Sequence, residues 1–303
     1  MLVFLGVTYN SVFSQELFPN NEPASTMPNG VTGIRFTEML HYKYDTWGHR
    51  EALRFMYGLT PKVTVMLSTY FSNFHVNSFP ENLNLYYSNY HNHQSDESSY
   101  PYQFEGIHLY SKWRFFSKDR THKHFRLALF GEFSYITSVH IDAFPSLMGD
   151  NSGMGFGIIA TTLHNKMAVS ITGGFNNFFS YEKTGSDTIA FKAGNAININ
   201  LSLGYLLFPR SYKNYSDLNF NLYLETNFRV YQGPYITRNG YTINSDQFSY
   251  LKGGSLLFLY PGIQFIVNSK TRIDLSMETP VYFSEDLDRF TMGIITLQRY
   301  FYK

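Results

Sequence analysis

The sequence predicts an all-β protein, a transmembrane antiparallel up-and-down β-barrel of about 12 strands. Three observations predict this fold. Long segments alternate apolar and polar side chains, short and long connections follow one another along the chain, and the composition is rich in aromatic residues but poor in charged ones.

The composition suits a membrane protein built from strands. Aromatic residues make up 18% of the 303 residues, with 29 Phe and 25 Tyr but 2 Trp, and charged residues make up 16%. Tyrosine can bury its ring at a lipid boundary while its hydroxyl stays in water. The mean hydropathy of −0.23 is compatible with a membrane location, because a spanning strand turns one face to lipid and the other to the interior.

Net charge and cysteine content exclude several classes of function. The formal net charge is +1, from 24 basic and 23 acidic residues, so the chain lacks the basic excess of a nucleic-acid-binding protein. It contains no cysteine, which excludes disulfides, thiolate metal sites and cysteine nucleophiles.

The N-terminal part of the chain precedes the alternating segments. Residues 1–14 are mostly apolar or small, which predicts a signal peptide whose true start could lie upstream. Residues 15–30 carry three prolines among Asn and Ser, so we expect an extended periplasmic lead-in that joins no strand ladder. Residues 31–303 then form the transmembrane barrel.

The strands of the barrel are predicted from their alternation. In the clearest segment, Ile197, Ile199 and Leu201 share one face, and Asn198 and Asn200 share the other. Such segments are about 10–14 residues long, which is enough for a tilted membrane crossing. A soluble β-sandwich or a lipocalin-like barrel would also alternate, but its strands are typically nearer five or six residues. The predicted strands are residues 31–42, 51–60, 62–75, 104–117, 125–141, 153–164, 166–179, 195–208, 218–233, 253–268, 271–283 and 289–302.

The connections between these strands alternate in length. The mostly short ones lie at residues 60–61, 117–124, 165, 209–217 and 269–270, and the mostly longer ones at 43–50, 76–103, 142–152, 180–194, 234–252 and 284–288. Short periplasmic turns and long outer loops are typical of bacterial outer-membrane barrels, and an even strand count returns both termini to the periplasm. We therefore expect a bacterial outer-membrane location, with outer-membrane lipid as the surrounding partner.

The chain also resembles a known group of proteins. The matching stretches are residues 22–30 (EPASTMPNG), 53–62 (LRFMYGLTPK), 169–175 (VSITGGF) and 298–301 (QRYF). They are similar to Bacteroidetes outer-membrane β-barrel proteins generically described as transporters, and more loosely to the phenol-degradation-associated barrels grouped with fatty-acid-type importers. The resemblance implies a location and a fold, but no catalytic residues and no defined substrate. The aromatic C-terminal strand resembles the signal read by the outer-membrane assembly machinery, although Lys303 replaces the usual terminal Phe.

If the apolar faces meet lipid, the opposite faces line a lumen. The charged candidates for that lining are Arg35, Arg54, Lys112, Arg114, Arg126, Glu132, Glu225, Arg229, Arg272, Asp274 and Glu278. Seven of these are basic and four acidic, so an open lumen would favour anions. A barrel of this size can also be filled by its own side chains. The function is therefore predicted as an outer-membrane channel or transporter for a small solute, anionic by this count. The alternative is a non-conducting structural or interaction barrel that anchors a membrane complex through its loops or turns.

Other site chemistry receives less support from the sequence. Residues 76–103 are the richest candidate for an extracellular binding loop, and the residues proposed there are Tyr86, Tyr87, Tyr90, His91 and His93. Two nearby histidines in a polar loop fall short of the three or four ligands that a metal site needs, so we expect no metal and no cofactor. The His-x-Ser-Asn-Gly pattern of outer-membrane phospholipases is missing, and Ser138-Val139-His140 has the reverse order and no nameable third member. We therefore expect no enzyme activity.

Overall fold

The computed structural model describes residues 18–43, 46–73, 102–121, 123–137, 145–185, 187–209, 217–244, 252–284 and 290–302. Within these ranges the chain forms sixteen β-strands. The same residues contain no helix of sufficient length and hydrophobicity to span a membrane. The predicted signal peptide, residues 1–14, lies outside the described residues.

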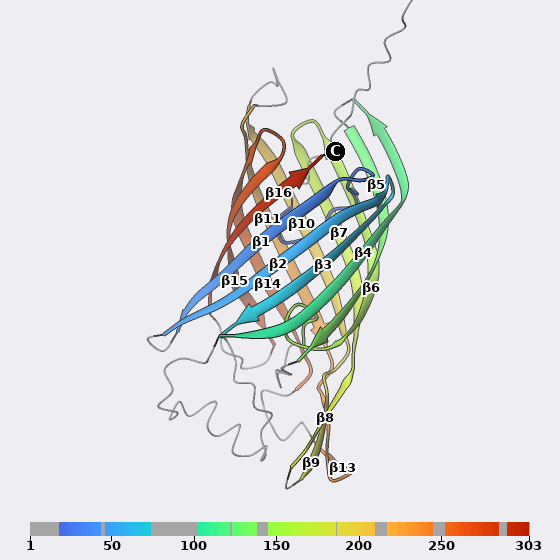
Figure 1. Ribbon diagram of the computed structural model, residues 1–303, viewed down its shortest axis with the longest axis vertical. Coiled ribbons are helices and arrows are strands. Elements are labelled where there is room, and N and C mark those ends of the chain that lie inside the picture. The colour runs from blue at the N-terminus through green and yellow to red at the C-terminus, as the bar shows by residue number, and fades with distance from the viewer. Residues whose placement is uncertain are drawn as a thin grey trace, which may run out of the picture.

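Twelve of the strands close into one antiparallel barrel (Figure 1). They are β1 (Thr32–Lys43), β2 (Thr46–Thr60), β3 (Val63–Ser72), β4 (Gln103–Arg120), β5 (Lys123–Ile136), β6 (Gly153–His164), β7 (Met167–Phe178), β10 (Ala196–Phe208), β11 (Asn219–Tyr231), β14 (Gly254–Val267), β15 (Thr271–Phe283) and β16 (Met292–Phe301). Each barrel strand pairs with the barrel strand that precedes it in the chain, and β1 closes the ring by pairing with β16 from Thr32↔Phe301 to Leu40↔Gly293. The predicted fold class, a closed up-and-down barrel of twelve strands, is confirmed.

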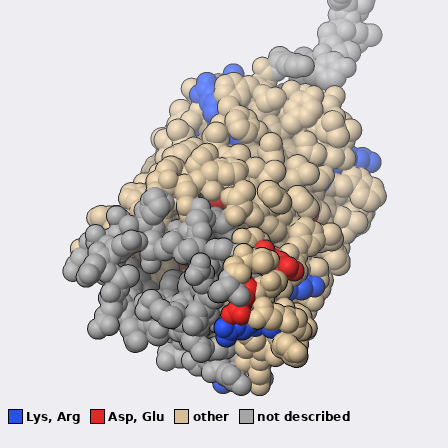
Figure 2. All heavy atoms as spheres, turned by 60° about the horizontal axis from the view of Figure 1, so that its bottom comes forward, with Lys and Arg blue, Asp and Glu red and all other residues tan. Residues whose placement is uncertain are grey.

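The two faces of the wall differ as the alternation predicts. On β10 and β11, Leu201 and Leu222 are 39% and 41% exposed on the outside, whereas Asn221 is completely buried. Apolar side chains on the other strands, such as Phe36 and Phe156, are exposed in the same way. In Figure 2 the side wall in view is mostly uncharged. The barrel therefore has an apolar outer surface and a polar interior.

Strand lengths at the outer end differ from the sequence prediction. Residues 43–50 were expected to form a loop, but β1 and β2 remain paired as far as Lys43↔Thr46. Aromatic side chains explain part of this extension, because Tyr42 and Trp47 face each other across the two strands with ring centroids 5.2 Å apart.

A second, four-stranded sheet extends the long-loop end of the barrel, at the bottom of Figure 1. It contains β8 (Ser180–Thr184), β9 (Thr188–Lys192), β12 (Tyr235–Arg238) and β13 (Tyr241–Ile243), in the order β13-β12-β9-β8. The sequence prediction treated residues 180–194 and 234–252 as loops, and that part of the prediction is wrong. The alternation of a single segment does not reveal the pairing of β9 with β12, which joins two hairpins that are far apart in the chain.

Apolar side chains fill the interior near both ends of the barrel. At the long-loop end, an outer cluster joins side chains of the second sheet to side chains of the barrel; its buried members are Leu147, Phe178, Ile189, Phe191, Ala193, Ala196, Tyr231, Ile236, Leu256, Phe258 and Phe283. At the short-turn end, an inner cluster joins Met27 and Val31 to Met56, Met66 and Tyr110.

Candidate functional site

An N-terminal plug, residues 18–30, lies inside the barrel. Its backbone amides donate to side chains of the wall: Asn21 to the Glu225 carboxylate at 2.8 Å, Ala24 to Thr161 Oγ1 at 2.8 Å, and Met27 to Thr64 Oγ1 at 2.8 Å. Its three prolines disfavour a regular ladder, so the remaining amides find acceptors on the wall instead. These contacts place the described part of residues 15–30 inside the barrel, where it joins no strand ladder.

Glu22 of the plug is held by three basic side chains of the wall. Its Oε1 lies 3.3 Å from Arg35 Nη1 and 3.0 Å from Arg54 Nη1, and its Oε2 lies 3.4 Å from Lys112 Nζ. The three bases come from β1, β2 and β4, and their side chains are 5%, 15% and 0% exposed. We call Arg35, Arg54 and Lys112 the three-cation site. Buried charges of this kind require a partner, and here one carboxylate contacts all three.

The wall and the plug fix each of these bases in position. Arg35 Nε donates to Gln298 Oε1 at 2.6 Å, and Arg54 Nε donates to Ser68 Oγ at 2.9 Å. Lys112 Nζ also donates to the carbonyl oxygen of Pro23 in the plug at 2.5 Å. Burial alone would raise the pKa of Glu22, but the charges of Lys112, Arg35 and Arg54 outweigh it and lower this pKa to about 2.

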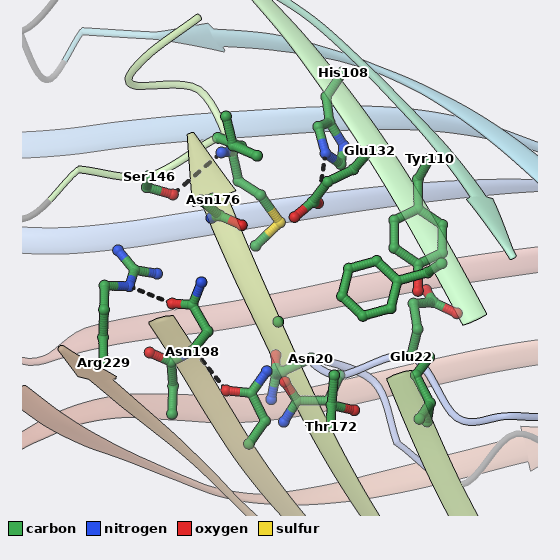
Figure 3. Close-up of a pocket in the computed structure, with 18 of the residues that line it drawn as sticks. Asn20, Glu22, His108, Tyr110, Glu132, Ser146, Thr172, Asn176, Asn198 and Arg229 are labelled. Carbon is green, nitrogen blue, oxygen red and sulfur yellow. Dashed lines mark hydrogen bonds and ion pairs between the residues drawn. The ribbon is translucent and has the colours of Figure 1, made fainter. Parts of the chain in front are cut away.

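A cavity of about 130 Å³ lies between the plug and the outer end of the barrel (Figure 3). Amides dominate its polar lining, and the asparagines involved are Asn20, Asn21, Asn176, Asn198, Asn200 and Asn227. Charged groups in the lining have partners, since His108 Nε2 lies 3.0 Å from Glu132 Oε2 and Arg229 Nε donates to Asn198 Oδ1 at 2.6 Å. Tyr110 and Phe130 form one wall as stacked rings with centroids 5.4 Å apart. We call this cavity the chamber.

Residues 145–152 fold inward and cover the chamber from the outer end. Ser146, Leu147 and Met148 line the cavity, and Leu147 is buried in the outer cluster. Asp150 accepts a hydrogen bond from Arg50 Nη2 at 2.6 Å, and the carbonyl oxygen of Pro145 accepts one from Arg229 Nη1 at 2.7 Å. The chamber is therefore bounded by the plug on one side and by this segment on the other.

The structure places the eleven predicted lumen residues on the interior face of the wall. Arg35, Arg54 and Lys112 contact the plug through Glu22, Arg126 through Ser25 Oγ, and Glu225 through Asn20 and Asn21. Glu132 and Arg229 line the chamber. The other four lie elsewhere on the same face.

Those four residues make contacts within the wall and its turns. Arg272 pairs with Asp274 at 3.4 Å, and Glu278 accepts a hydrogen bond from Tyr260 at 2.8 Å. Arg114 donates to the carbonyl oxygen of Pro61 at the short-turn end. The loop candidates Tyr86, Tyr87, Tyr90, His91 and His93 lie outside the described residues.

Sequence reasoning missed several interior residues. His108 shares the face of Lys112 on β4, so the alternation could have identified it. Glu22 and Asp150 gave no such signal, because neither acid belongs to an alternating segment.

One group of described residues has ligand atoms close enough to hold a metal. Side-chain atoms of Glu38, His49 and Glu51 lie within 4.8 Å of one another on the outer face of β1 and β2. His49 Nδ1 already contacts Glu38 Oε1 at 3.1 Å. Ordinary pairing between a histidine and a carboxylate accounts for this contact, so we assign the group no role.

Comparison with known proteins gives a likeness in fold. No known family profile matches the sequence, and no curated protein matches it. Among solved structures, the COG4313 outer membrane channel from Pseudomonas putida F1 is similar with a TM-score of 0.57 and 11% identity, over 94% of this chain and 100% of that one.

Two further solved structures have lower scores. The β-domain of the Bordetella autotransporter BrkA has a TM-score of 0.41 and 8% identity over 89% of this chain and 98% of that one. OmpF from Salmonella typhi, in complex with daunomycin, has a TM-score of 0.34 and 7% identity over 89% and 96%. Scores of this size carry no argument, and the first likeness supports the fold alone: the chain shares the architecture of outer-membrane β-barrels.

Proposed function

We propose that this protein is a bacterial outer-membrane channel or transporter that passes a small polar solute through the barrel interior, and that the N-terminal plug closes this path. The observation that carries the proposal is the chamber: a cavity with an amide-rich polar lining inside a barrel whose outer surface is apolar. Binding and passage of a solute are the functions that such a cavity suits.

The outer-membrane location in this proposal is supported by the two faces of the wall. Side chains such as Leu224, 40% exposed, are unfavourable in water and favourable against hydrocarbon. A closed barrel leaves no unpaired strand edge, as a bilayer requires. The sequence resemblance to Bacteroidetes barrels described as transporters agrees with this location. We also propose that the outer-membrane assembly machinery recognises the aromatic C-terminal end of β16.

Passage requires the plug to move, and its contacts allow that. They are hydrogen bonds and ion pairs, such as Ala24 to Thr161 and Glu22 to Arg54, together with apolar packing around Phe18, Ala24 and Met27. When the plug moves, the polar groups of the wall that it had contacted would bind water in an open lumen. This hydration reduces the free-energy cost of opening. No catalytic step is part of the proposal.

A reversible crosslink tests this proposal, because the chain contains no cysteine of its own. The Ala24→Cys/Thr161→Cys pair replaces two residues whose backbone nitrogen and Oγ1 are 2.8 Å apart. We expect single-channel current steps in planar bilayers from the reduced protein and none from the oxidised protein. Each single cysteine variant serves as the control, and its current should be insensitive to oxidation.

Two outcomes would contradict the proposal. Current that persists after verified crosslinking would mean that the path does not involve plug movement. Silence of both forms, with the barrel folded, would favour the alternative of a non-conducting anchoring barrel.

A further inference from the structure

We infer that the three-cation site binds the carboxylate of the transported solute, and that Glu22 is an internal carboxylate that occupies this site in the plugged state. Transport of the solute rests on the proposed function, whereas the binding site itself does not. The inference deepens the expected preference for anions by naming a chemical class and a place of binding.

The number of cations is the first argument. Arg35, Arg54 and Lys112 lie almost entirely out of solvent, and all three contact the same carboxylate. When the plug leaves, Glu22 leaves with it. The three bases then line an open lumen without the carboxylate that they share, and an anion is the group that can replace it.

Geometry narrows the anion to a carboxylate. Both oxygens of Glu22 are used, with Oε1 facing the two guanidinium groups and Oε2 facing the ammonium group. Each guanidinium contributes one nitrogen to Oε1, so the three donors are spaced for the two oxygens of a planar carboxylate. The wall also holds the donors in place through Gln298 and Ser68. A solute carboxylate would therefore find these donors largely preorganised.

The chamber provides space for the rest of the solute. Glu22, which is labelled in Figure 3, and Arg54 line the chamber, so the three-cation site borders the chamber at Arg54. The stacked rings of Tyr110 and Phe130 lie nearby, and amides such as Asn200 line another part. This combination suits a small monocarboxylate with a short uncharged body, which can contact the rings while its carboxylate reaches the bases.

Exchange of one carboxylate for another links binding to opening. A solute that displaces Glu22 keeps the three bases paired with a carboxylate while the plug leaves. Glu22 is tethered, which makes it a competitor at high effective concentration. Wild-type protein should therefore bind a carboxylate more weakly than a variant whose residue 22 is neutral.

Isothermal titration of the folded, detergent-solubilised protein with butyrate tests the inference. We expect Glu22→Gln to bind butyrate at least about tenfold more tightly than wild type. Butyramide, which is neutral and similar in shape, should bind far more weakly. Glu278→Gln is the matched control: it removes one interior carboxylate outside the three-cation site and the chamber lining, and its butyrate affinity should equal that of wild type.

Three results would overturn the inference. They are equal butyrate affinity of Glu22→Gln and wild type, equal affinity of Glu22→Gln for butyramide and butyrate, and tighter binding of sulfate than of butyrate, which would indicate a general anion site.

Hydrogen exchange of the wild-type protein provides a test that does not depend on a variant folding. Butyrate, but not butyramide, should speed exchange of the Ala24 and Met27 amides, and unchanged rates would count against displacement of Glu22. The two proposals can fail separately. If the protein binds butyrate but gives no current in bilayers, the channel proposal is wrong. If it gives current but does not bind butyrate, the proposed carboxylate site is wrong.

Discussion

At the scale of the residue, Glu22 carries the charge on which the proposed plugging of the barrel depends. It introduces a negative charge where the wall presents Arg35, Arg54 and Lys112, and removing one partner from buried charges of this kind typically costs about 3–5 kcal/mol. The count of seven basic and four acidic wall residues predicted a positive lumen, but it omitted Glu22. In the plugged state this residue supplies part of the missing negative charge.

The lowered pKa of Glu22 predicts how plugging depends on pH. The carboxyl group has a pKa of about 2 in the plugged state, against an ordinary value of 4.5. A lowered pKa stabilises the plugged state fully above pH 4.5, and this contribution is lost as the pH falls through 4.5 towards 2. The open probability in planar bilayers should therefore rise as the pH falls across this range.

Glu22→Gln is the control for this titration. Its open probability should be high already at neutral pH and should change little on acidification. A pH response of the variant equal to that of wild type would assign the titration to another group.

At the scale of the element, the plug is accommodated by a glycine on β2. The Gly30 amide donates to the carbonyl oxygen of Gly58 at 2.8 Å. A Cβ atom on Gly58 would lie 2.0 Å from the carbonyl oxygen of Pro28, closer than atoms can approach. Residues 28–30 of the plug can lie against β2 because Gly58 lacks a side chain.

Gly58→Ala should therefore displace residues 28–30 of the plug. We expect a cost of about 1–3 kcal/mol to the plugged state, seen as faster hydrogen exchange at the Met27 and Gly30 amides. Gly173→Ala on β7 is the matched control, since a Cβ there meets nothing within 4 Å. Equal exchange in Gly58→Ala and wild type would show that the plug does not depend on this close approach.

The elements also show where sequence patterns succeed. A strand in the barrel wall separates lipid-like and polar surroundings, so its alternation is strong, and the segment starting at Ile197 predicts β10 almost to the residue. The short strands β9 and β12 lie outside the barrel wall and do not separate lipid-like from polar surroundings. They are stabilised by pairing with each other and by burial of Phe191 and Ile236 in the outer cluster, which are non-local contacts.

At the scale of the whole molecule, the apolar outer surface is the property that determines where the barrel is stable. Leu224 lies near the middle of β11 and is 40% exposed on this surface. Its replacement by arginine would place a charge in hydrocarbon.

Leu224→Arg should lower the free energy of folding into lipid vesicles by about 2–4 kcal/mol, measured by denaturant titration. Tyr241→Arg is the control, because Tyr241 is 81% exposed on β13, outside the barrel wall, and should tolerate the charge. If both variants lose the same free energy, the outer wall does not face hydrocarbon near Leu224.

The sequence by itself determined the barrel: which face of each wall strand is apolar, the number of strands in the wall, and several of the charged residues that point inward. This was possible because each wall strand lies between two different surroundings, and the alternation of its own residues records that difference. Only the tertiary structure decided what fills the interior. The plug, the inward segment 145–152 and the β9–β12 pairing depend on contacts such as Asn21 with Glu225, 204 residues apart. Such contacts leave no periodic trace in either partner, because each is a single encounter fixed by closure of the whole barrel.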